Sequence, residues 1–419
     1  MNELIVTFKT VNAAPSFRVA SEDDNMVAAF MYEFFALFPG VNLKTQKIKA
    51  LHQCTPDIKA SINTFVDQYK KEFPVLNGVA AFFNRLADQE WFYFIPFKIL
   101  NAEENISLTN YITALNTPGE DFKRLQQQTN ELFGDLMKDY TILAFGEDRK
   151  SIGEVDKSNR VCRFCNNTRL PLSFNNRAHA ISEALGNKTL ILLEECDGCN
   201  EHFSKTIEPD LIEYLSLFRT IYDIKGKGGK KHLIGKNFEL KKTDKLTLKF
   251  ESDDENTGPS LPMNIPLHSH QDIASQNIYK TLCKYFLSVI PAEYLQNFQE
   301  TIQWINEDKE IKELPRIASI LLYDKLSEQP ELVTYIRKTT DKSFPYAVGE
   351  FHFTLFRYVF IIPGTSNDES QFLTDAEYGV FWDKFKHYNK LPGWKFENFS
   401  NNIKKPFSIN IKFDFSSPQ

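Results

Sequence analysis

The sequence predicts a multidomain α+β protein in which a small cysteine-bearing segment separates two larger domains. Three observations lead to this prediction. Apolar residues recur at helical spacing from about residue 24 to residue 146, four cysteines form two C-x-x-C pairs between residues 162 and 199, and strand-like alternation returns near the end of the sequence. With 419 residues, the chain is long enough for two or three domains.

The first domain is expected over residues 1–150 and is α-rich, with no motif that indicates its role. Residues 1–20 alternate loosely, which suits one or two strands. Asp24 and Asp57 are residues that commonly start helices. Apolar residues repeat at spacings of three and four in segments 24–38, 56–73, 77–95 and 121–140. The polar stretch 146–160 that follows is predicted to be a linker.

The last domain is expected over residues 233–419, with an α+β fold and a regulatory or partner-binding role. Two short alternating runs around a polar turn predict a hairpin within residues 238–250. An acidic loop, two helices and two groups of strands are then expected in residues 251–262, 271–290, 291–307, 350–362 and 407–415.

Charge and hydropathy exclude two broad classes of protein. The formal net charge is −6, so a general basic coat is absent and any contact with DNA must come from a local patch. The first residues include Glu3 and only a short apolar run, which does not match a signal peptide. No apolar stretch approaches the ~20 residues of a membrane span. We therefore expect a cytoplasmic protein that does not associate with membranes.

The cysteine pairs predict a metal site. Cys162 and Cys165 form the first C-x-x-C pair, and Cys196 and Cys199 form the second. Each pair directs two thiolates from one tight turn, so that two pairs complete a tetrahedral zinc site. Disulfides are rare in the cytoplasm, which favours metal over cross-linking. Chance pairs of buried thiols are the alternative, and we predict a structural Zn²⁺.

The residues between and after the pairs outline a strand, a loop, a second strand and a helix. The first strand ends near His179, Gly186 lies in the loop, an apolar run follows at 190–193, and Asn200 stands directly after the last cysteine. The matching text is C-R-F-C, then A-H-A-I-S-E-A-L-G-N, then C-D-G-C-N. Over residues 157–232 the chain resembles the HNH endonucleases, in the subgroup whose ββα-metal core is clamped by four cysteines.

This resemblance implies a role for three residues. His179 corresponds to the general base, and a neutral imidazole with a pKa near 6.5 can take a proton from water. Asn200 corresponds to a ligand of the catalytic Mg²⁺ or Mn²⁺, and its amide oxygen suits such a hard cation. Asn187 stands as the substitute for the middle Asn of the family name. The zinc would be structural, because four thiolates close its coordination sphere.

The chain departs from the family where many members carry an acid before the catalytic histidine, since Ala178 occupies that position. Glu183 and Glu208 are the candidates for the second metal ligand, and solvated surface acids are the alternative interpretation of both. His179 has the alternative of a core histidine, and Asn200 that of a helix cap. His202 is expected to face solvent.

A lysine-rich run lies just past the expected helix. Residues 157–232 hold twelve Lys and Arg against nine Asp and Glu, a net charge of +3 in a chain of −6. A flexible loop of lysines can follow a phosphate backbone without reading bases, and a charged linker is the alternative. The candidates for DNA binding are Lys225, Lys227, Lys230 and Lys231.

These features favour a metal-dependent HNH endonuclease, a hydrolase of DNA phosphodiester bonds. Many such fusions resemble bacterial restriction or anti-phage defence effectors, and the resemblance implies that antiviral role here. The flanking domains would then receive an activating protein or a small-molecule ligand. The alternative is a zinc-stabilised module that binds nucleic acid or protein and whose HNH active site has decayed.

Overall fold

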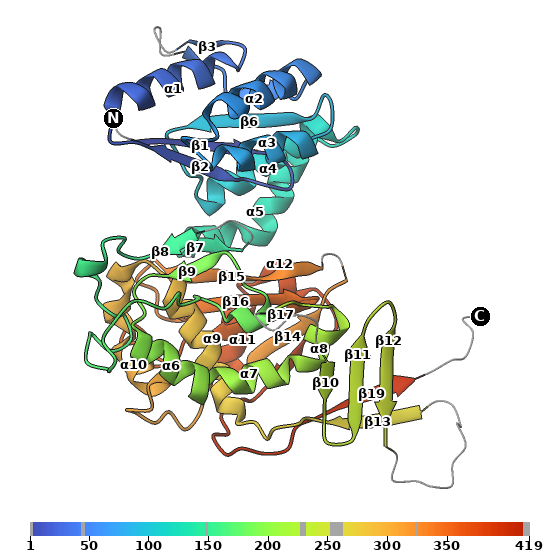
Figure 1. Cartoon of the computed structure of the whole chain (residues 1–419). Helices are drawn as coiled ribbons and strands as arrows, with labels where there is room; N and C mark the ends of the chain where they lie inside the picture. Colours follow the sequence, from blue (N-terminus) through green and yellow to red (C-terminus); the bar gives the residue numbers. More distant parts are fainter. Residues whose placement is uncertain are drawn as a thin grey trace. The chain divides into compact units, whose positions relative to one another are not determined.

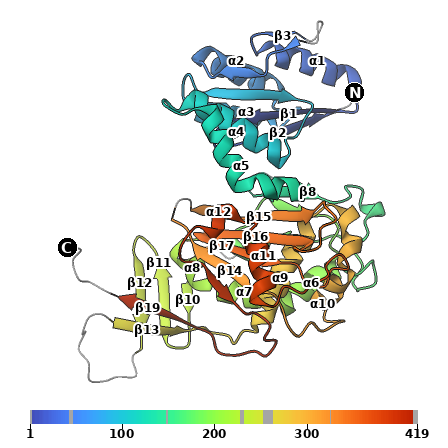
Figure 2. The same ribbon diagram turned by 180° about the vertical axis from the view of Figure 1, so that it is seen from behind.

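The computed structural model describes residues 3–42, 47–146, 150–226, 232–251, 263–323 and 326–413. The chain divides into two compact units, Met1–Lys138 and Asp139–Gln419, which we call unit 1 and unit 2. Figures 1 and 2 show both units from opposite sides. Each unit mixes helices with strands, as the α+β prediction requires. Within the described ranges, no helix is long and apolar enough to cross a bilayer.

Unit 1 contains an antiparallel sheet with the strand order β2-β1-β6-β5. Its strands are β1 (Glu3–Lys9), β2 (Ser16–Ala20), β3 (Val41–Asn42), β4 (Lys47–Ile48), β5 (Leu51–Gln53) and β6 (Trp91–Pro96). Its helices are α1 (Asp24–Ala36), α2 (Pro56–Tyr69), α3 (Leu76–Arg85), α4 (Ala102–Asn116) and α5 (Phe122–Asp139). Helices start in four of the predicted segments, but the third segment ends in β6, because Phe92 and Phe94 alternate with less buried neighbours.

Phenylalanine rings fill the core of unit 1. Phe8 on β1 lies 4.9 Å from Phe83 of α3, and Phe38 stacks on Phe94 of β6 at 4.3 Å, measured between ring centroids. All four rings are at most 1% exposed. Aromatic pairs at these separations add attraction to the burial of apolar area. Much of the high phenylalanine content of the chain therefore builds this core.

Unit 2 is built around a six-stranded antiparallel sheet with the strand order β18-β14-β17-β16-β15-β7. Smaller sheets are β10-β11-β12, β13-β19 and β8-β9. The strands are β7 (Tyr140–Phe145), β8 (Lys150–Ile152), β9 (Leu190–Leu192), β10 (His232–Ile234), β11 (Phe238–Lys242), β12 (Leu246–Phe250), β13 (Met263–His268), β14 (Ile317–Leu321), β15 (Ser327–Arg337), β16 (Ala347–Thr354), β17 (Phe356–Ile361), β18 (Lys395–Glu397) and β19 (Ser408–Phe413).

The helices of unit 2 lie in three stretches of the chain, residues 197–221, 275–305 and 375–389. They are α6 (Asp197–Thr206), α7 (Glu208–Tyr214), α8 (Ser216–Ile221), α9 (Ser275–Val289), α10 (Gln299–Ile305), α11 (Asp375–Trp382) and α12 (Lys386–Asn389), with 3-10 turns at Lys157–Asn159, Glu183–Leu185 and Ala292–Phe298. The predicted hairpin at 238–250 is present as β11 and β12. The acidic loop expected at 251–262 lies outside the described residues, apart from Glu251.

The boundary between the units differs from the predicted one at residue 150. Strand β7 pairs with β15 along its whole length, from Phe145 opposite Leu332 to Tyr140 opposite Arg337. Residues 140–145 therefore belong to the sheet of unit 2, and the boundary falls at Lys138. The sequence gives no sign of this, because the partner strand lies almost two hundred residues further along the chain.

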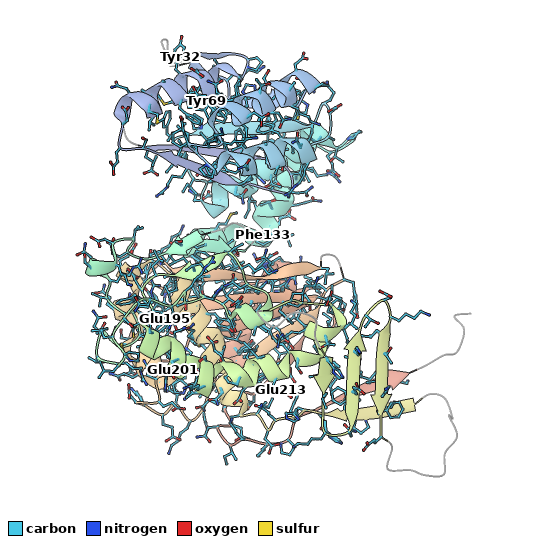
Figure 3. All side chains as sticks on the ribbon, viewed as in Figure 1. Tyr32, Tyr69, Phe133, Glu195, Glu201 and Glu213 are labelled. Carbon is cyan, nitrogen blue, oxygen red and sulfur yellow. The ribbon has the colours of Figure 1, made fainter. Side chains whose placement is uncertain are left out.

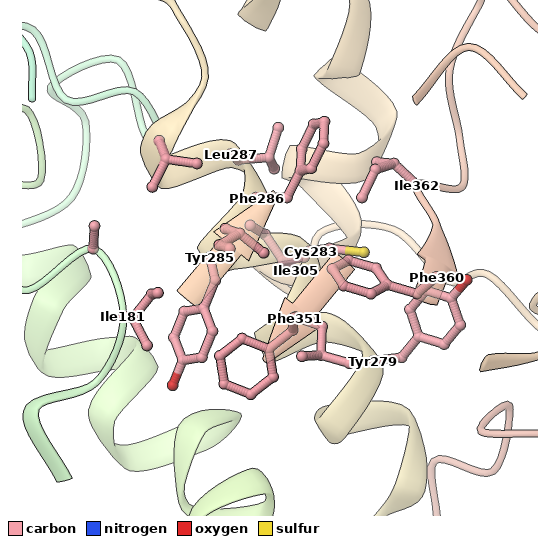
Figure 4. Packing of buried hydrophobic residues seen from close by; sticks show 14 of the residues in the cluster. Ile181, Tyr279, Cys283, Tyr285, Phe286, Leu287, Ile305, Phe351, Phe360 and Ile362 are labelled. Atoms are coloured by element: carbon pink, nitrogen blue, oxygen red, sulfur yellow. The ribbon is translucent and has the colours of Figure 1, made fainter. Parts of the chain in front are cut away.

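The segment 157–232 is not a separate domain either, since it shares one hydrophobic core with the rest of unit 2. Helix α9 is buried along nearly all its length and carries much of this core. In Figure 4, Ile181 of the cysteine-bearing segment lies beside Tyr285 of α9, with Phe351 of β16 nearby. The predicted division into a 157–232 module and a 233–419 domain thus becomes one folded unit, because each part covers apolar side chains of the other.

Candidate functional site

The four predicted zinc ligands come together. The Sγ atoms of Cys162, Cys165, Cys196 and Cys199 all lie within 4.8 Å of one another. The separation of Cys165 Sγ and Cys196 Sγ is 3.7 Å, and thiolates around a tetrahedral zinc with bonds of about 2.3 Å lie about 3.8 Å apart. Three of the cysteines are buried and Cys165 is half-buried. The cluster can hold a metal ion such as zinc.

Backbone groups support the thiolates of this cluster. The amide of Cys196 donates to Cys162 Sγ, that of Cys199 to Cys196 Sγ and that of Arg169 to Cys165 Sγ, each at 3.4 Å. Such donors stabilise thiolates and fix the ligands before a metal binds. A side chain at Gly198 would put its Cβ 2.6 Å from the carbonyl oxygen of Leu170, so glycine lets the second cysteine pair approach the backbone at Leu170 this closely.

Asp197 connects the second cysteine pair to the segment that leads to His179. Its buried carboxylate accepts hydrogen bonds from Ser173 Oγ and from the amides of Asn175 and Asn176, the latter two at 3.2 and 2.9 Å. Charge-assisted hydrogen bonds of this kind are stronger than neutral ones. We call the two cysteine pairs and the residues inside them, 162–165 and 196–199, the cysteine frame. Through Asp197 this frame fixes the path of the chain just before His179.

His179 forms an isolated antiparallel bridge with Ile191 of β9, ahead of α6. The amide of Ala180 donates to Leu190 O at 3.1 Å, and that of Leu192 donates to Ala178 O at 2.9 Å. Both alanine side chains are buried, at 2% and 0% exposure. The order of this segment is thus a bridge at His179, a 3-10 turn, β9 and α6. The strand that was expected to end near His179 is reduced to that bridge.

The environment of His179 favours its neutral form. Burial lowers the pKa of the imidazole below its ordinary value of 6.5, and the carboxylate of Glu183, the next largest influence, only partly opposes this shift. His179 Nε2 lies 3.7 Å from Glu183 Oε2, and the imidazole is 15% exposed. His179 Nδ1 is buried and has no hydrogen-bond partner among the described residues. A neutral imidazole at cellular pH can accept a proton.

Asn187 is buried at 1% exposure and fully occupied by backbone groups. Its Nδ2 donates to Ile181 O at 2.7 Å and to Leu190 O at 3.0 Å. Its Oδ1 accepts from the amides of Thr189 and Leu190 at 3.1 and 3.0 Å. This geometry suits holding the loop between the two strands, and it leaves no free group to contact a substrate directly.

The remaining predicted residues differ in their surroundings. Asn200 lies half-buried in the first turns of α6, directly after Cys199. Glu183 stays partly exposed, with 37% of its side-chain surface accessible. Glu208, predicted as a surface acid or a metal ligand, is instead buried and pairs with Lys284 at 3.2 Å. His202, expected to face solvent, is half-buried with a buried Nε2, because α6 packs against the core.

Of the four predicted DNA-binding lysines, Lys225 is exposed and lies 3.9 Å from Asp223 Oδ2. The next residue, Gly226, is close enough to the turn after His179 that an added Cβ would lie 3.0 Å from Ala184 Cα. The lysine run thus begins beside the histidine site. Its other members, Lys227, Lys230 and Lys231, lie outside the described residues.

Sequence reasoning missed the charged groups beneath the site. Lys284 of α9 pairs with Glu195 and Glu208, and its own side chain is 1% exposed. Burial raises the pKa of Glu195 to about 7, against the opposing effect of Lys284. In Figure 3, Glu195 lies in the interior of unit 2 and Glu201 on α6. A lysine within the apolar pattern of a predicted helix was the available sign.

Arg163 was also missed, although it lies inside the first cysteine pair. Its Nη1 donates to the carbonyls of Leu287, Ser288 and Ile290 at 2.9 to 3.1 Å, and its Nη2 pairs with Glu194 at 2.5 Å. Carbonyls at the end of a helix lack partners within the helix, and a cation there also suits the helix dipole. Arg163 therefore links the first cysteine pair to the C-terminal end of α9 by hydrogen bonds.

Comparison with protein-family models, with curated proteins and with solved structures gives no match to this chain.

Proposed function

We propose that unit 2 is a metal-dependent endonuclease of the HNH type that hydrolyses DNA phosphodiester bonds. The observation that carries this proposal is the placement of His179. Its imidazole is desolvated, has a lowered pKa, and lies at a bridge to β9 between the two cysteine pairs of the four-cysteine cluster. This arrangement supports general-base chemistry at His179, with zinc in a structural role because four thiolates complete its coordination.

The residues of the chain divide the work of the reaction. His179 accepts a proton from the attacking water through Nε2, the nitrogen that is not enclosed by the protein. Glu183 lies 3.7 Å from this nitrogen, where its negative charge favours the imidazolium that forms. Asn200 and Glu183 are the residues that would hold Mg²⁺ or Mn²⁺. When bound, such a cation neutralises charge on the scissile phosphate and the leaving oxygen.

DNA is the proposed substrate because the lysine run starts beside this site. Lys225 is exposed, and Gly226 lies against the turn that contains Glu183. Lysines at that position neutralise phosphates without reading sequence. A role in bacterial restriction or anti-phage defence, with an activating protein or small-molecule ligand acting through other parts of the chain, extends the same proposal.

A binding module with a decayed active site is the second candidate, and one observation favours it. Lys284 engages both Glu195 and Glu208, so these carboxylates are not available as metal ligands. Ala178 offers no acid either, because its side chain is a buried methyl group. Glu183 then remains as the acid that pairs with the imidazole in the described part of the chain.

A plasmid-cutting assay separates the two candidates. Zinc-loaded full-length protein is incubated with supercoiled plasmid in Mg²⁺ or Mn²⁺, with and without EDTA, and DNA binding is measured in parallel. A nuclease yields nicked or linear product that depends on the added cation. Binding without any cleavage, in all cations tested and at retained zinc content, would reject the nuclease and favour the binding module.

A further inference from the structure

A buried ammonium group joins three parts of the candidate site. Lys284 Nζ lies 3.0 Å from Glu195 Oε2, 3.2 Å from Glu208 Oε1 and 3.5 Å from the backbone carbonyl oxygen of His179. Glu195 immediately precedes the second cysteine pair, and Glu208 is the first residue of α7. One cation from α9 thus contacts the backbone of His179, the residue before the second cysteine pair and the first residue of α7.

This arrangement needs a reason, because burying charge is unfavourable. The side chains of Lys284 and Glu195 are 1% and 0% exposed, and desolvation of each such ion costs several kcal/mol. Burial acts to lower the pKa of Lys284, but the two carboxylates outweigh it and raise that pKa. The two carboxylates therefore favour the charged form of the lysine. The ring centroids of Phe164 and Phe203 lie 5.9 and 5.8 Å from Lys284 Nζ.

We propose that Lys284 is a positioning residue of the nuclease site. From a helix outside the cysteine-bearing segment, it holds the backbone of His179 in place relative to the cysteine frame. This inference rests on the proposed function. Lys284 does not touch the substrate, because its side chain is enclosed on all sides. It acts through the backbone of His179 and through Glu208, so that the imidazole, Glu183 and α6 keep their mutual geometry.

Helix α9 supplies a matched control. Lys280 lies one turn before Lys284 and is also buried, at 7% exposure. Its Nζ lies 5.7 Å from the Trp304 ring centroid. In the described structure it makes no ion pair or hydrogen bond with His179, Glu195 or Glu208. Lys280→Met and Lys284→Met therefore remove the same group from the same helix at similar burial. Only Lys284→Met removes a contact with the site.

The first measurement is steady-state cleavage of plasmid DNA by the full-length variants at saturating Mg²⁺. A misplacement of about 1 Å at a reacting group lowers rate about a hundred-fold, so we expect a loss of that order in kcat for Lys284→Met, with KM for DNA near the wild-type value. Lys280→Met should keep the wild-type kcat. Lys284→Arg keeps charge and donors, and should recover part of the loss. Equal kcat for Lys280→Met and Lys284→Met would overturn the proposal.

A second variant separates positioning from folding. Lys284→Met combined with Glu195→Gln and Glu208→Gln leaves no unpaired buried charge, and should restore the unfolding temperature and zinc content without restoring kcat. If this triple variant regains wild-type kcat, Lys284 only balances charge and the proposal is wrong. A triple variant that folds, holds zinc and stays slow supports positioning.

The last measurement does not depend on cleavage. Amide hydrogen exchange of peptides covering residues 177–193 reports the pairing of Ala180 with Leu190 and of Leu192 with Ala178. Faster exchange there in the triple variant, with wild-type exchange in Lys280→Met, supports positioning even if wild-type protein never cuts DNA. In that case the nuclease proposal alone would fail. Unchanged exchange in the triple variant would overturn the role of Lys284 whether or not the protein cuts.

Discussion

Replacement of His179 by alanine separates chemistry from stability at the candidate site. If His179 is the general base, its removal lowers the cleavage rate about a hundred- to ten-thousand-fold. This loss corresponds to about 3–5 kcal/mol of activation free energy. The proposed nuclease should therefore become inactive in a standard plasmid assay, while the zinc stays bound, because His179 supplies none of the four thiolates.

The structure predicts a much smaller effect on folding. The imidazole is 15% exposed, and its packed ring atoms contribute about 1.5–3 kcal/mol. Its buried Nδ1 has no partner among the described residues, which costs about 1–3 kcal/mol. The two contributions oppose each other, so His179→Ala should change the free energy of unfolding by at most about 2 kcal/mol in either direction.

His202 is the matched control for this experiment. It is a second half-buried histidine of the same segment, its pKa is also lowered by burial, and its Nε2 is likewise buried without a partner among described residues. Cleavage of plasmid, zinc content and urea unfolding are measured for both variants. We expect His202→Ala to cut like the wild type.

The pH dependence provides an independent check. Burial lowers the pKa of His179 below 6.5. A base at this position therefore stays active at pH 6.5 and loses activity as the pH falls through the lowered pKa. The same shift makes the folded state less stable as the pH falls below 6.5, because the unfolded chain binds the proton more readily.

If His179→Ala, folded and zinc-bound, cuts as fast as His202→Ala, the general base lies elsewhere.

Three further predictions concern the metal, the extent of the folded unit and the lysine run. The purified protein should hold about one Zn²⁺ per chain, and Cys199→Ser should lose it in metal analysis, while Cys283→Ala, a free cysteine outside the cluster, should keep it. Residues 157–232 alone should not fold or retain zinc, whereas residues 139–419 should, since α9 carries the shared core; a zinc-bound, cooperatively unfolding 157–232 peptide would contradict this. Changing Lys225, Lys227, Lys230 and Lys231 to Gln should reduce the salt dependence of DNA binding by about one counterion per lost contact, and an unchanged slope would make the run a linker.

Local patterns in the sequence predicted local features of the site. Two C-x-x-C pairs were enough to predict the four-cysteine cluster, because each pair is a short turn with a fixed geometry. Pro209 has no amide hydrogen to continue a helix, and α6 accordingly ends at Thr206 before α7 begins at Glu208. The strand that was expected to end near His179 is not formed, and a single bridge between His179 and Ile191 of β9 takes its place.

Contacts between distant residues could not be predicted in the same way. Lys284 lies 105 residues after His179, and periodicity places it on a helix without saying which groups that helix covers. The pairing of β7 with β15 could not be predicted for the same reason, because the two strands are far apart in the sequence. Local patterns therefore predicted the four-cysteine cluster but not the folded unit that holds it.

Arg163 has a consequence for the order of events during synthesis. Its guanidinium binds the carbonyl of Ile290, which is made 127 residues later. Domains fold as units while the chain emerges from the ribosome, and early segments wait for their late partners. The first cysteine pair therefore leaves the ribosome well before the helix end that it caps. A metal held by the four cysteines is therefore expected to be bound stably only after α9 has formed.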